Sequence, residues 1–173
     1  MNKNLPKEIE RKYLIKRPTS QVLDSLPDVN RTEIEQIYLN RPNPSITRRI
    51  RKRGTKENGF KYYYTEKIPV SFGEKIEIEK EIVSDEYLDL KKDIDKKTSP
   101  IYKERYCFNY KNQFFELDVY DFSDELATLE IELDNINTPV ELPDFIELIS
   151  DVTGDKRYSN AALSYTHTLK IFE

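Results

Sequence analysis

Hydrophobic and polar residues alternate with a period of two along most of the chain, which indicates β-strands with two different faces. The cleanest case is the segment 75–83, in which Ile76, Ile78 and Ile82 alternate with charged residues. Short links rich in turn-forming residues separate such segments, and a Gly-containing break at 54–59 leads into an aromatic run. The pattern predicts about eight strands, at 8–15, 35–39, 47–51, 60–67, 75–83, 102–108, 114–120 and 128–133.

Other segments favour helices. Ser84 is placed to cap a helix over 85–97, which carries an apolar stripe. A short helix is expected around 22–26, and Pro143 suits the first turn of another that runs towards Ile149. A last helix is expected over 159–169. Together these elements predict a mainly β (α+β) protein with peripheral helices, folded as a single domain over residues 1–173.

The strand faces carry an unusual arrangement of charge. Side chains at positions i and i+2 of a strand point to the same side, so Glu8, Glu10 and Lys12 share one face. A charged face turned to water is common in antiparallel sheets and explains any single strand of this kind. Several faces, however, carry neighbouring charges of one sign, whereas a face selected only for solubility would more often mix signs. These pairs are Arg49 with Arg51, Glu77 with Glu79, Lys103 with Arg105, and Glu130 with Glu132.

A closed barrel with these faces turned inward would gather both signs of charge in one cavity. Basic residues there would clamp a polyanion, and carboxylate pairs would hold divalent cations that bridge its oxygens. The apolar faces would then point outward and need the helices as a cover, which inverts the usual barrel. The alternative left open by the residues alone is a structural barrel whose charged face is solvated.

Composition narrows the classes of function. The 173 residues are 35% charged and 37% hydrophobic, and eight Phe and twelve Tyr argue against disorder. The chain has 28 basic and 32 acidic residues, and its net charge of −4 gives no indication of a nucleic-acid partner. No stretch is apolar enough for a membrane span or a signal peptide. We therefore expect a cytoplasmic protein without a membrane partner.

Cysteine and histidine are too scarce for several kinds of site. Cys107 is the single cysteine and His167 the single histidine, which excludes internal disulfides, the common tetrahedral zinc sites and an obvious Ser-His-Asp or Cys-His device. A metal used by this chain should therefore be a hard cation held by carboxylates. The sequence gives no indication of the oligomeric state.

Residues 8–12, Glu-Ile-Glu-Arg-Lys, match the ExExK signature of the CYTH, or triphosphate tunnel metalloenzyme, superfamily. The chain resembles the small single-domain bacterial members in the order of its other motifs as well. These are Gln36-Ile37-Tyr38-Leu39, Arg49-Ile50-Arg51, Thr65-Glu66-Lys67, Lys75-Ile76-Glu77-Ile78-Glu79, Lys103-Glu104-Arg105-Tyr106, Glu116-Leu117-Asp118-Val119, Glu130-Ile131-Glu132-Leu133 and the closing run 152–160.

The resemblance implies an eight-stranded antiparallel closed barrel that hydrolyses triphosphates with Mg²⁺ or Mn²⁺. Carried onto matching positions, it implies metal ligands at Glu8, Glu10, Glu130 and Glu132, with contributions from Asp118 and Glu116. It also implies a set of phosphate-binding residues, in which Arg51 and Lys67 take part in catalysis. This set is Lys12, Arg49, Arg51, Lys67, Lys75, Lys103, Arg105 and Lys156. At Lys75 many relatives carry arginine, so the charge is kept but the bidentate grip is lost.

Tyr38 stands where small bacterial members have a tyrosine that is proposed to accept a proton. With an ordinary pKa of about 10, a tyrosine is a poor base at neutral pH, although a ring of Lys and Arg would favour the phenolate. The alternative is ordinary packing, since Tyr38 is one of twelve tyrosines.

Inorganic triphosphate is the expected small-molecule substrate, because no base-recognition or thiazole-recognition device is evident. The absence of tryptophan disfavours a vertebrate-like thiamine triphosphatase. A class IV-type adenylate cyclase, a nucleoside triphosphatase and a polyphosphate-binding sensor without turnover are the alternatives. The long segment 53–64 is interpreted as a hairpin, with a substrate-selecting lip as the second interpretation.

Overall fold

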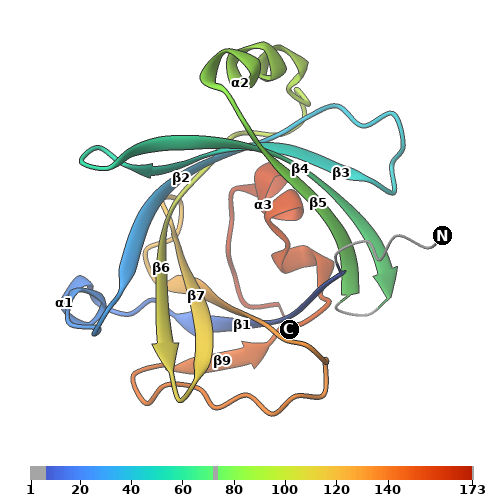
Figure 1. Ribbon diagram of the computed structural model, residues 1–173. Helices are drawn as coiled ribbons and strands as arrows, with labels where there is room; N and C mark the ends of the chain where they lie inside the picture. Colours follow the sequence, from blue (N-terminus) through green and yellow to red (C-terminus); the bar gives the residue numbers. More distant parts are fainter. Residues whose placement is uncertain (1–6, 72–73, 173) are drawn as a thin grey trace.

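The computed structural model describes residues 7–71 and 74–172, and its strands form one antiparallel sheet that curls around a central space (Figure 1). The helices are α1 (Ser20–Asp24), α2 (Ser84–Leu90) and α3 (Asn160–Thr166), with 3₁₀ turns η1 (Lys91–Asp93) and η2 (Lys156–Tyr158). The strands are β1 (Lys7–Lys16), β2 (Asn30–Tyr38), β3 (Thr47–Thr55), β4 (Gly59–Ser71), β5 (Glu74–Ile82), β6 (Ile101–Tyr110), β7 (Gln113–Tyr120), β8 (Leu126–Glu132) and β9 (Leu148–Asp151).

The sheet closes into a barrel through β1. Strands follow the order β5-β4-β3-β2-β6-β7-β8-β1, and the start of β1 also pairs with β5, where Glu8 lies opposite Lys75. Beyond that point β1 runs along β8, from the pair Glu10 and Glu132 to the pair Lys16 and Leu126. Closure leaves no free edge between these eight strands, which confirms the expected eight-stranded antiparallel barrel.

The prediction of a helix that starts at Pro143 is wrong, and a ninth strand, β9, follows this segment instead. Residues 143–147 form turns and irregular backbone, and β9 then pairs with β1 at Tyr13, Leu14 and Ile15. The pairing of β5 with β1 ends at Ile9, so the later part of that edge would carry unpaired backbone groups. Strand β9 supplies their partners, which is a long-range requirement that the local sequence does not reveal.

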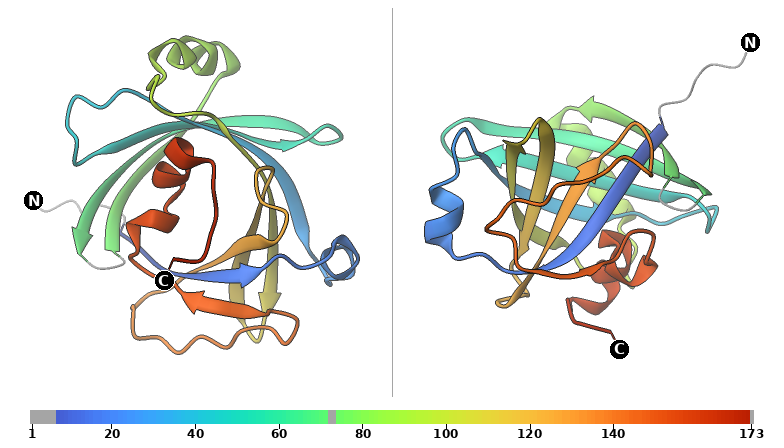
Figure 2. Two further views of the ribbon diagram at one scale, coloured as in Figure 1. Left: turned by 180° about the vertical axis from the view of Figure 1, so that it is seen from behind. Right: turned by 90° about the horizontal axis from the view of Figure 1, so that it is seen from below.

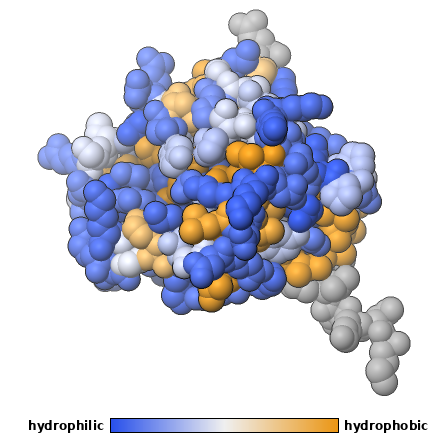
Figure 3. All heavy atoms as spheres, turned by 90° about the horizontal axis from the view of Figure 1, so that it is seen from above, coloured by the Kyte–Doolittle hydropathy of each residue, from blue (hydrophilic) through white to orange (hydrophobic). Residues whose placement is uncertain are grey.

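Two hydrophobic clusters of the described residues lie outside the barrel, as the inverted arrangement predicts. On one side Phe115, Leu117 and Leu129 are fully buried beneath α1 and the segment 134–147. On the other side Ile37 and Ile50 pack against α2 and its own core residue Tyr87. The face that α2 covers shows a mainly hydrophilic surface with scattered hydrophobic patches (Figure 3). The strands therefore turn their apolar faces towards the covering helices and leave their charged faces for the interior.

Helix α3 covers one end of the barrel, where both end-on views place it inside the ring of strands (Figures 1 and 2). Its residue Leu163 packs in a cluster with Leu14, Tyr38 and Tyr120 from the strands. Ser159 caps the helix, because its hydroxyl accepts a hydrogen bond of 3.1 Å from the backbone N–H of Ala162. The expected C-terminal helix is present but ends at Thr166, and it closes the barrel end instead of lying at the periphery.

Of two further local predictions, the cap at Ser84 is wrong and the hairpin over 53–64 is confirmed. Ser84 is the first residue of α2 and not its cap, and the helix ends at Leu90 before η1. The segment 53–64 forms the long hairpin of β3 and β4, where Gly54 lies so close to Gly59 that an added Cβ would come within 2.1 Å of its carbonyl oxygen. Within the described residues, no helix has the length and apolarity that crossing a membrane requires.

Candidate active site

Charged side chains from different strands meet inside the barrel. Lys67 of β4 pairs with Glu8 of β1 at 2.7 Å, and Arg51 of β3 pairs with Glu79 of β5 at 2.9 Å. Each of these pairs skips a strand, which places both partners on the concave face of the sheet. The charged and polar side chains that share this lumen are Glu8, Glu10, Lys12, Gln36, Tyr38, Arg49, Arg51, Thr65, Lys67, Lys75, Glu77, Glu79, Lys103, Arg105, Glu116, Asp118, Glu130 and Glu132.

The deepest part of the lumen is an ion-pair cluster centred on Asp118, which is fully buried. Arg105 donates to both of its carboxylate oxygens, at 2.6 and 2.8 Å, and Lys103 also donates to one of them. Arg105 reaches Glu130 at 3.4 Å, and Lys12 pairs with the same carboxylate at 2.6 Å. Because Asp118 already accepts from two cations, this geometry suits a counter-ion that orients Lys103 and Arg105 better than a metal ligand.

Burial and mutual charge set the protonation of this cluster. Burial lowers the pKa of Lys103 to about 8, although Asp118 acts in the opposite direction. Burial also disfavours the charged form of Glu130, but Lys12 and Arg105 outweigh it and hold the pKa of Glu130 well below its usual range. The cluster is therefore an assembly of paired charges in which Lys103 is the cation most easily altered by a change in its surroundings.

A second wall of the lumen presents unsatisfied cationic donors. Arg49 and Arg51 are each 7% exposed, and in both the guanidinium Nε is buried without a hydrogen-bond partner among the described residues. Arg49 pairs loosely with Glu77 at 3.7 Å, whereas Lys67 pairs with that carboxylate at 2.7 Å. Burial and the charge of Arg49 lower the pKa of Arg51 to about 10. Buried donors without acceptors are costly, so this wall is suited to an anion with several oxygens.

Carboxylates gather where β1, β7 and β8 meet. Glu10 lies opposite Glu132 in the sheet, and Lys75 and Lys67 pair with Glu10 and Glu8. No ion pair within the described chain involves Glu132. Glu132 is exposed overall, and its pKa is raised by partial desolvation and by neighbouring carboxylates, of which Glu8 acts most strongly. A cation bound here would relieve this repulsion.

These carboxylates fit a hard divalent cation in chemistry, since Mg²⁺ and Mn²⁺ take oxygen ligands. Among residues 7–71 and 74–172, however, no three acidic, His or Cys side chains converge closely enough to hold an ion as they stand. Glu8 and Glu10 form ion pairs with Lys67 and Lys75, and these pairs would have to break before the carboxylates could bind an ion. The residues that would hold a metal are then Glu8, Glu10 and Glu132.

Tyr38 lies near the end of the lumen that α3 closes, with only 6% of its surface exposed. Gln36 donates to its hydroxyl at 2.7 Å, and the positive charge of Arg49 lies near it. Burial nevertheless outweighs the effects of Arg49 and Gln36 and raises the pKa of Tyr38 above its ordinary value. The phenol is thus neutral at neutral pH, which does not suit the expected role as proton acceptor.

Lys156 is the one phosphate-binding candidate that the described contacts do not join to the others. It is exposed on η2, and no ion pair or hydrogen bond of the described residues involves its side chain.

From the sequence, no role was expected for Gln36 or for Asn160. Asn160 accepts hydrogen bonds from Lys103 at 3.3 Å and from Tyr120 at 3.0 Å. Gln36 carried one usable signal, because it lies two residues before Tyr38 and therefore shares its strand face.

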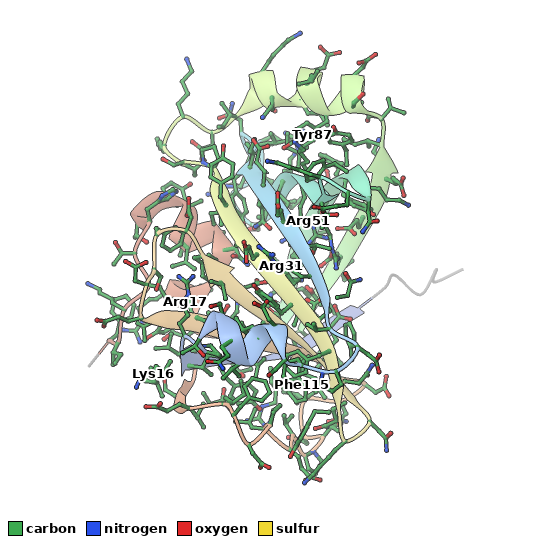
Figure 4. The ribbon with its side chains drawn as sticks, turned by 90° about the vertical axis from the view of Figure 1, so that its left-hand side faces the viewer. Lys16, Arg17, Arg31, Arg51, Tyr87 and Phe115 are labelled. Atoms are coloured by element: carbon green, nitrogen blue, oxygen red, sulfur yellow. The ribbon has the colours of Figure 1, made fainter. Side chains whose placement is uncertain are left out.

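A hollow of about 500 Å³ lies on the outer wall of the barrel across β2 and β6. Arg17, one of its lining residues, is labelled in Figure 4. The lining also includes the outward-facing Glu33, Tyr102 and Glu104, and of the lumen cations it includes Lys103. Arg49, Arg51 and Lys67 do not line it. The concentration of buried, incompletely paired cations favours the lumen as the functional site, whatever the size of the outer hollow.

The fold is a closed antiparallel barrel with a charged lumen, whose apolar outer strand faces are covered by helices and loops. The family model described as the CYTH domain matches residues 6–163. The chain belongs to the CYTH domain family. No curated protein sequence matches it significantly.

Solved structures share the fold. The inorganic triphosphatase NE1496 is similar with a TM-score of 0.57 and 28% sequence identity, over 91% of this chain and 94% of that one. The PH1819 protein from Pyrococcus horikoshii OT3 gives a TM-score of 0.56 and 21% identity, over 74% and 79% of the two chains. HpAC1 from Hippeastrum, an adenylyl cyclase candidate described as having a dominant triphosphatase activity, gives 0.51 and 13%, over 73% and 80%. The latter two likenesses concern the fold alone.

Proposed function

We propose that this chain is a metal-dependent triphosphatase that hydrolyses inorganic triphosphate to diphosphate and phosphate inside the barrel. The observation that carries the proposal is the pair of buried guanidinium groups, Arg49 and Arg51, whose Nε donors have no partner among the described residues. A chain of phosphates offers many oxygens to such donors. The likeness to the inorganic triphosphatase NE1496 over 91% of the chain supports the same substrate class.

The lumen residues would bind the substrate by exchange of partners. Arg49, Arg51 and Lys67 pair with Glu77, Glu79 and Glu8, and phosphate oxygens would take the place of these carboxylates. These cationic side chains would hold the triphosphate in line for the reaction and stabilise the charge that develops on the transferred phosphoryl group.

The carboxylates set free in this way become available to a cation. Glu8, Glu10 and Glu132 would hold Mg²⁺ or Mn²⁺, which when bound neutralises charge on phosphate oxygens and makes water more acidic. Asp118 and Glu130 keep Lys103, Arg105 and Lys12 charged and oriented through their ion pairs. We assign Lys12, Lys75, Lys103 and Arg105 to substrate binding, together with Arg49, Arg51 and Lys67.

Inorganic triphosphate fits this site better than a nucleotide because α3 closes one end of the lumen. A base or a thiazolium ring would have to remain at the open end. Phosphate release from inorganic triphosphate, ATP and thiamine triphosphate, each with Mg²⁺, Mn²⁺ or a chelator, tests this choice. We expect fast release from inorganic triphosphate with metal, much slower release from the others, and none with the chelator. Formation of cyclic AMP, or release that a chelator leaves unchanged, would contradict the proposal.

Arg51→Ala should lower kcat/KM for inorganic triphosphate about 100-fold, because it removes a buried cation aimed at the developing charge. Steady-state kinetics measure the effect. The matched control is Arg31→Ala, which removes an arginine that pairs with Glu104 on the outer wall. The control should keep the wild-type kcat/KM. Equal losses in both variants would remove Arg51 from the site.

A further inference from the structure

Gln36 is a buried, uncharged side chain among the charges of the lumen. It is 0% exposed, and its amide Nε2 lies 2.7 Å from the hydroxyl oxygen of Tyr38. In the sheet Gln36 lies opposite Arg51, and Tyr38 lies opposite Arg49. A buried amide in such a place must be satisfied by specific partners, because each unsatisfied polar group costs free energy.

The neighbouring arginines determine which way the amide points. The Oε1 atom of Gln36 is buried without a partner among the described residues, and so are the Nε atoms of Arg49 and Arg51. A carbonyl oxygen is attracted by guanidinium groups, whereas an amide NH₂ is repelled by them. Oε1 therefore belongs on the side of the arginines, which turns the Nε2–H donor towards Tyr38.

The Tyr38 hydroxyl then receives a hydrogen bond from Gln36 and lies near the positive charge of Arg49, which stands opposite Tyr38 in the sheet. A phenolic oxygen accepts through its lone pairs and donates through a single proton. Because Gln36 donates to this oxygen and the charge of Arg49 repels a proton, the phenolic proton has to point away from both residues. It is directed into the lumen, where the proposed substrate would lie.

We propose that Gln36 is a positioning residue that fixes the Tyr38 hydroxyl as a hydrogen-bond donor to a phosphate oxygen of the substrate. The inference rests on the proposed function and deepens it. Tyr38 then stabilises negative charge on the phosphate, and no covalent bond of Tyr38 is made or broken. Burial keeps the phenol protonated, as this role requires and as the role of a proton acceptor does not.

A double-mutant cycle tests the coupling between the two residues. Gln36→Met keeps the approximate volume and removes the donor, and it should lower kcat for inorganic triphosphate about tenfold with little change in KM. Tyr38→Phe should lose at least as much, and the double variant should be no slower than Tyr38→Phe alone. Losses that simply multiply would overturn the proposal, because a purely structural role of Gln36 adds to any other defect. Gln113→Met, which changes a glutamine bonded to Pro139 outside the lumen, is the control and should leave both constants unchanged.

A spectroscopic measurement decides the geometry even if the wild type hydrolyses no triphosphate. In protein labelled with ¹³C at the hydroxyl-bearing ring carbon of tyrosine, the Tyr38 signal is identified by its absence from Tyr38→Phe. We expect a neutral phenol at neutral pH, a signal that moves when inorganic triphosphate is added, and a smaller movement in Gln36→Met. A phenolate signal, or a wild-type signal that triphosphate leaves in place, would overturn the proposal. Failure of the proposed function alone would instead appear as a moving signal without phosphate release.

Discussion

Glu132→Gln should lower metal-dependent turnover of triphosphate at least about 100-fold while leaving the protein as stable as the wild type or more stable. Glu132 has no ion-pair partner in the described part of the chain, and partial desolvation and repulsion by Glu8 and Glu116 raise its pKa. Neutralising it removes that repulsion but also removes a carboxylate that we assign to the metal. Loss of activity without loss of stability is the mark of a ligand and not of a structural residue. Phosphate release and thermal unfolding of the same preparation measure the two effects.

The stability difference should depend on pH in a defined direction. A carboxyl group whose folded-state pKa is raised destabilises the fold as pH rises from the ordinary glutamate range through the raised value. The melting temperature of Glu132→Gln relative to wild type should therefore increase from acidic to neutral pH without added metal. Glu141→Gln, which breaks an exposed pair with Lys111, is the matched control and should show neither effect. Full activity of Glu132→Gln would remove this residue from the metal site.

Asp118→Asn should lower the free energy of unfolding by about 3–5 kcal/mol, because it leaves Lys103 and Arg105 buried without their shared counter-ion. Asparagine keeps the size of the side chain, so the loss reflects charge and not a cavity. Burial disfavours ionisation of Asp118, but Arg105 and Lys103 hold its pKa below its usual range. The stabilisation is therefore present above the ordinary aspartate pKa and is lost as pH falls through the lowered one.

Denaturant unfolding at neutral and acidic pH measures this prediction. The gap between wild type and Asp118→Asn should be large at neutral pH and should shrink in acid. The exposed pair of Lys111 and Glu141 again gives the reference, since breaking it should cost less than about 1 kcal/mol. An equally small loss in Asp118→Asn would mean that the buried cluster does not stabilise the barrel.

The local pattern predicted the strands and their faces well, because apolar and charged residues alternate with a period of two along each strand. In β5, isoleucines at 76 and 78 turn outward and glutamates at 77 and 79 turn inward. Closure of β1 on β5 and the pairing of β9 depend on contacts between residues far apart in the chain. Pro143 favours the start of a helix locally, but no helix forms there, because the following residues pair as β9 with the otherwise unpaired edge of β1.

The residues that face the lumen were more predictable from the sequence than the ion pairs that they form. Same-sign neighbours such as Arg49 and Arg51 identified lumen residues, but their partners depend on the stagger of the closed barrel. Lys67 reaches Glu8 across β5 for this reason, and no sequence spacing encodes it. The protonation of Tyr38 also required the structure, because burial outweighs the neighbouring cations that would otherwise favour a phenolate.

A crystal structure of Glu132→Gln with inorganic triphosphate is the most direct test of the central claim, because slow turnover would preserve the substrate. We predict a chain of phosphates inside the barrel, within hydrogen-bond distance of Arg49 and Arg51 on one wall and reaching Lys67 or Lys103. Triphosphate bound in the hollow on the outer wall, or a lumen in which every cation keeps its carboxylate partner at saturating triphosphate, would contradict the account.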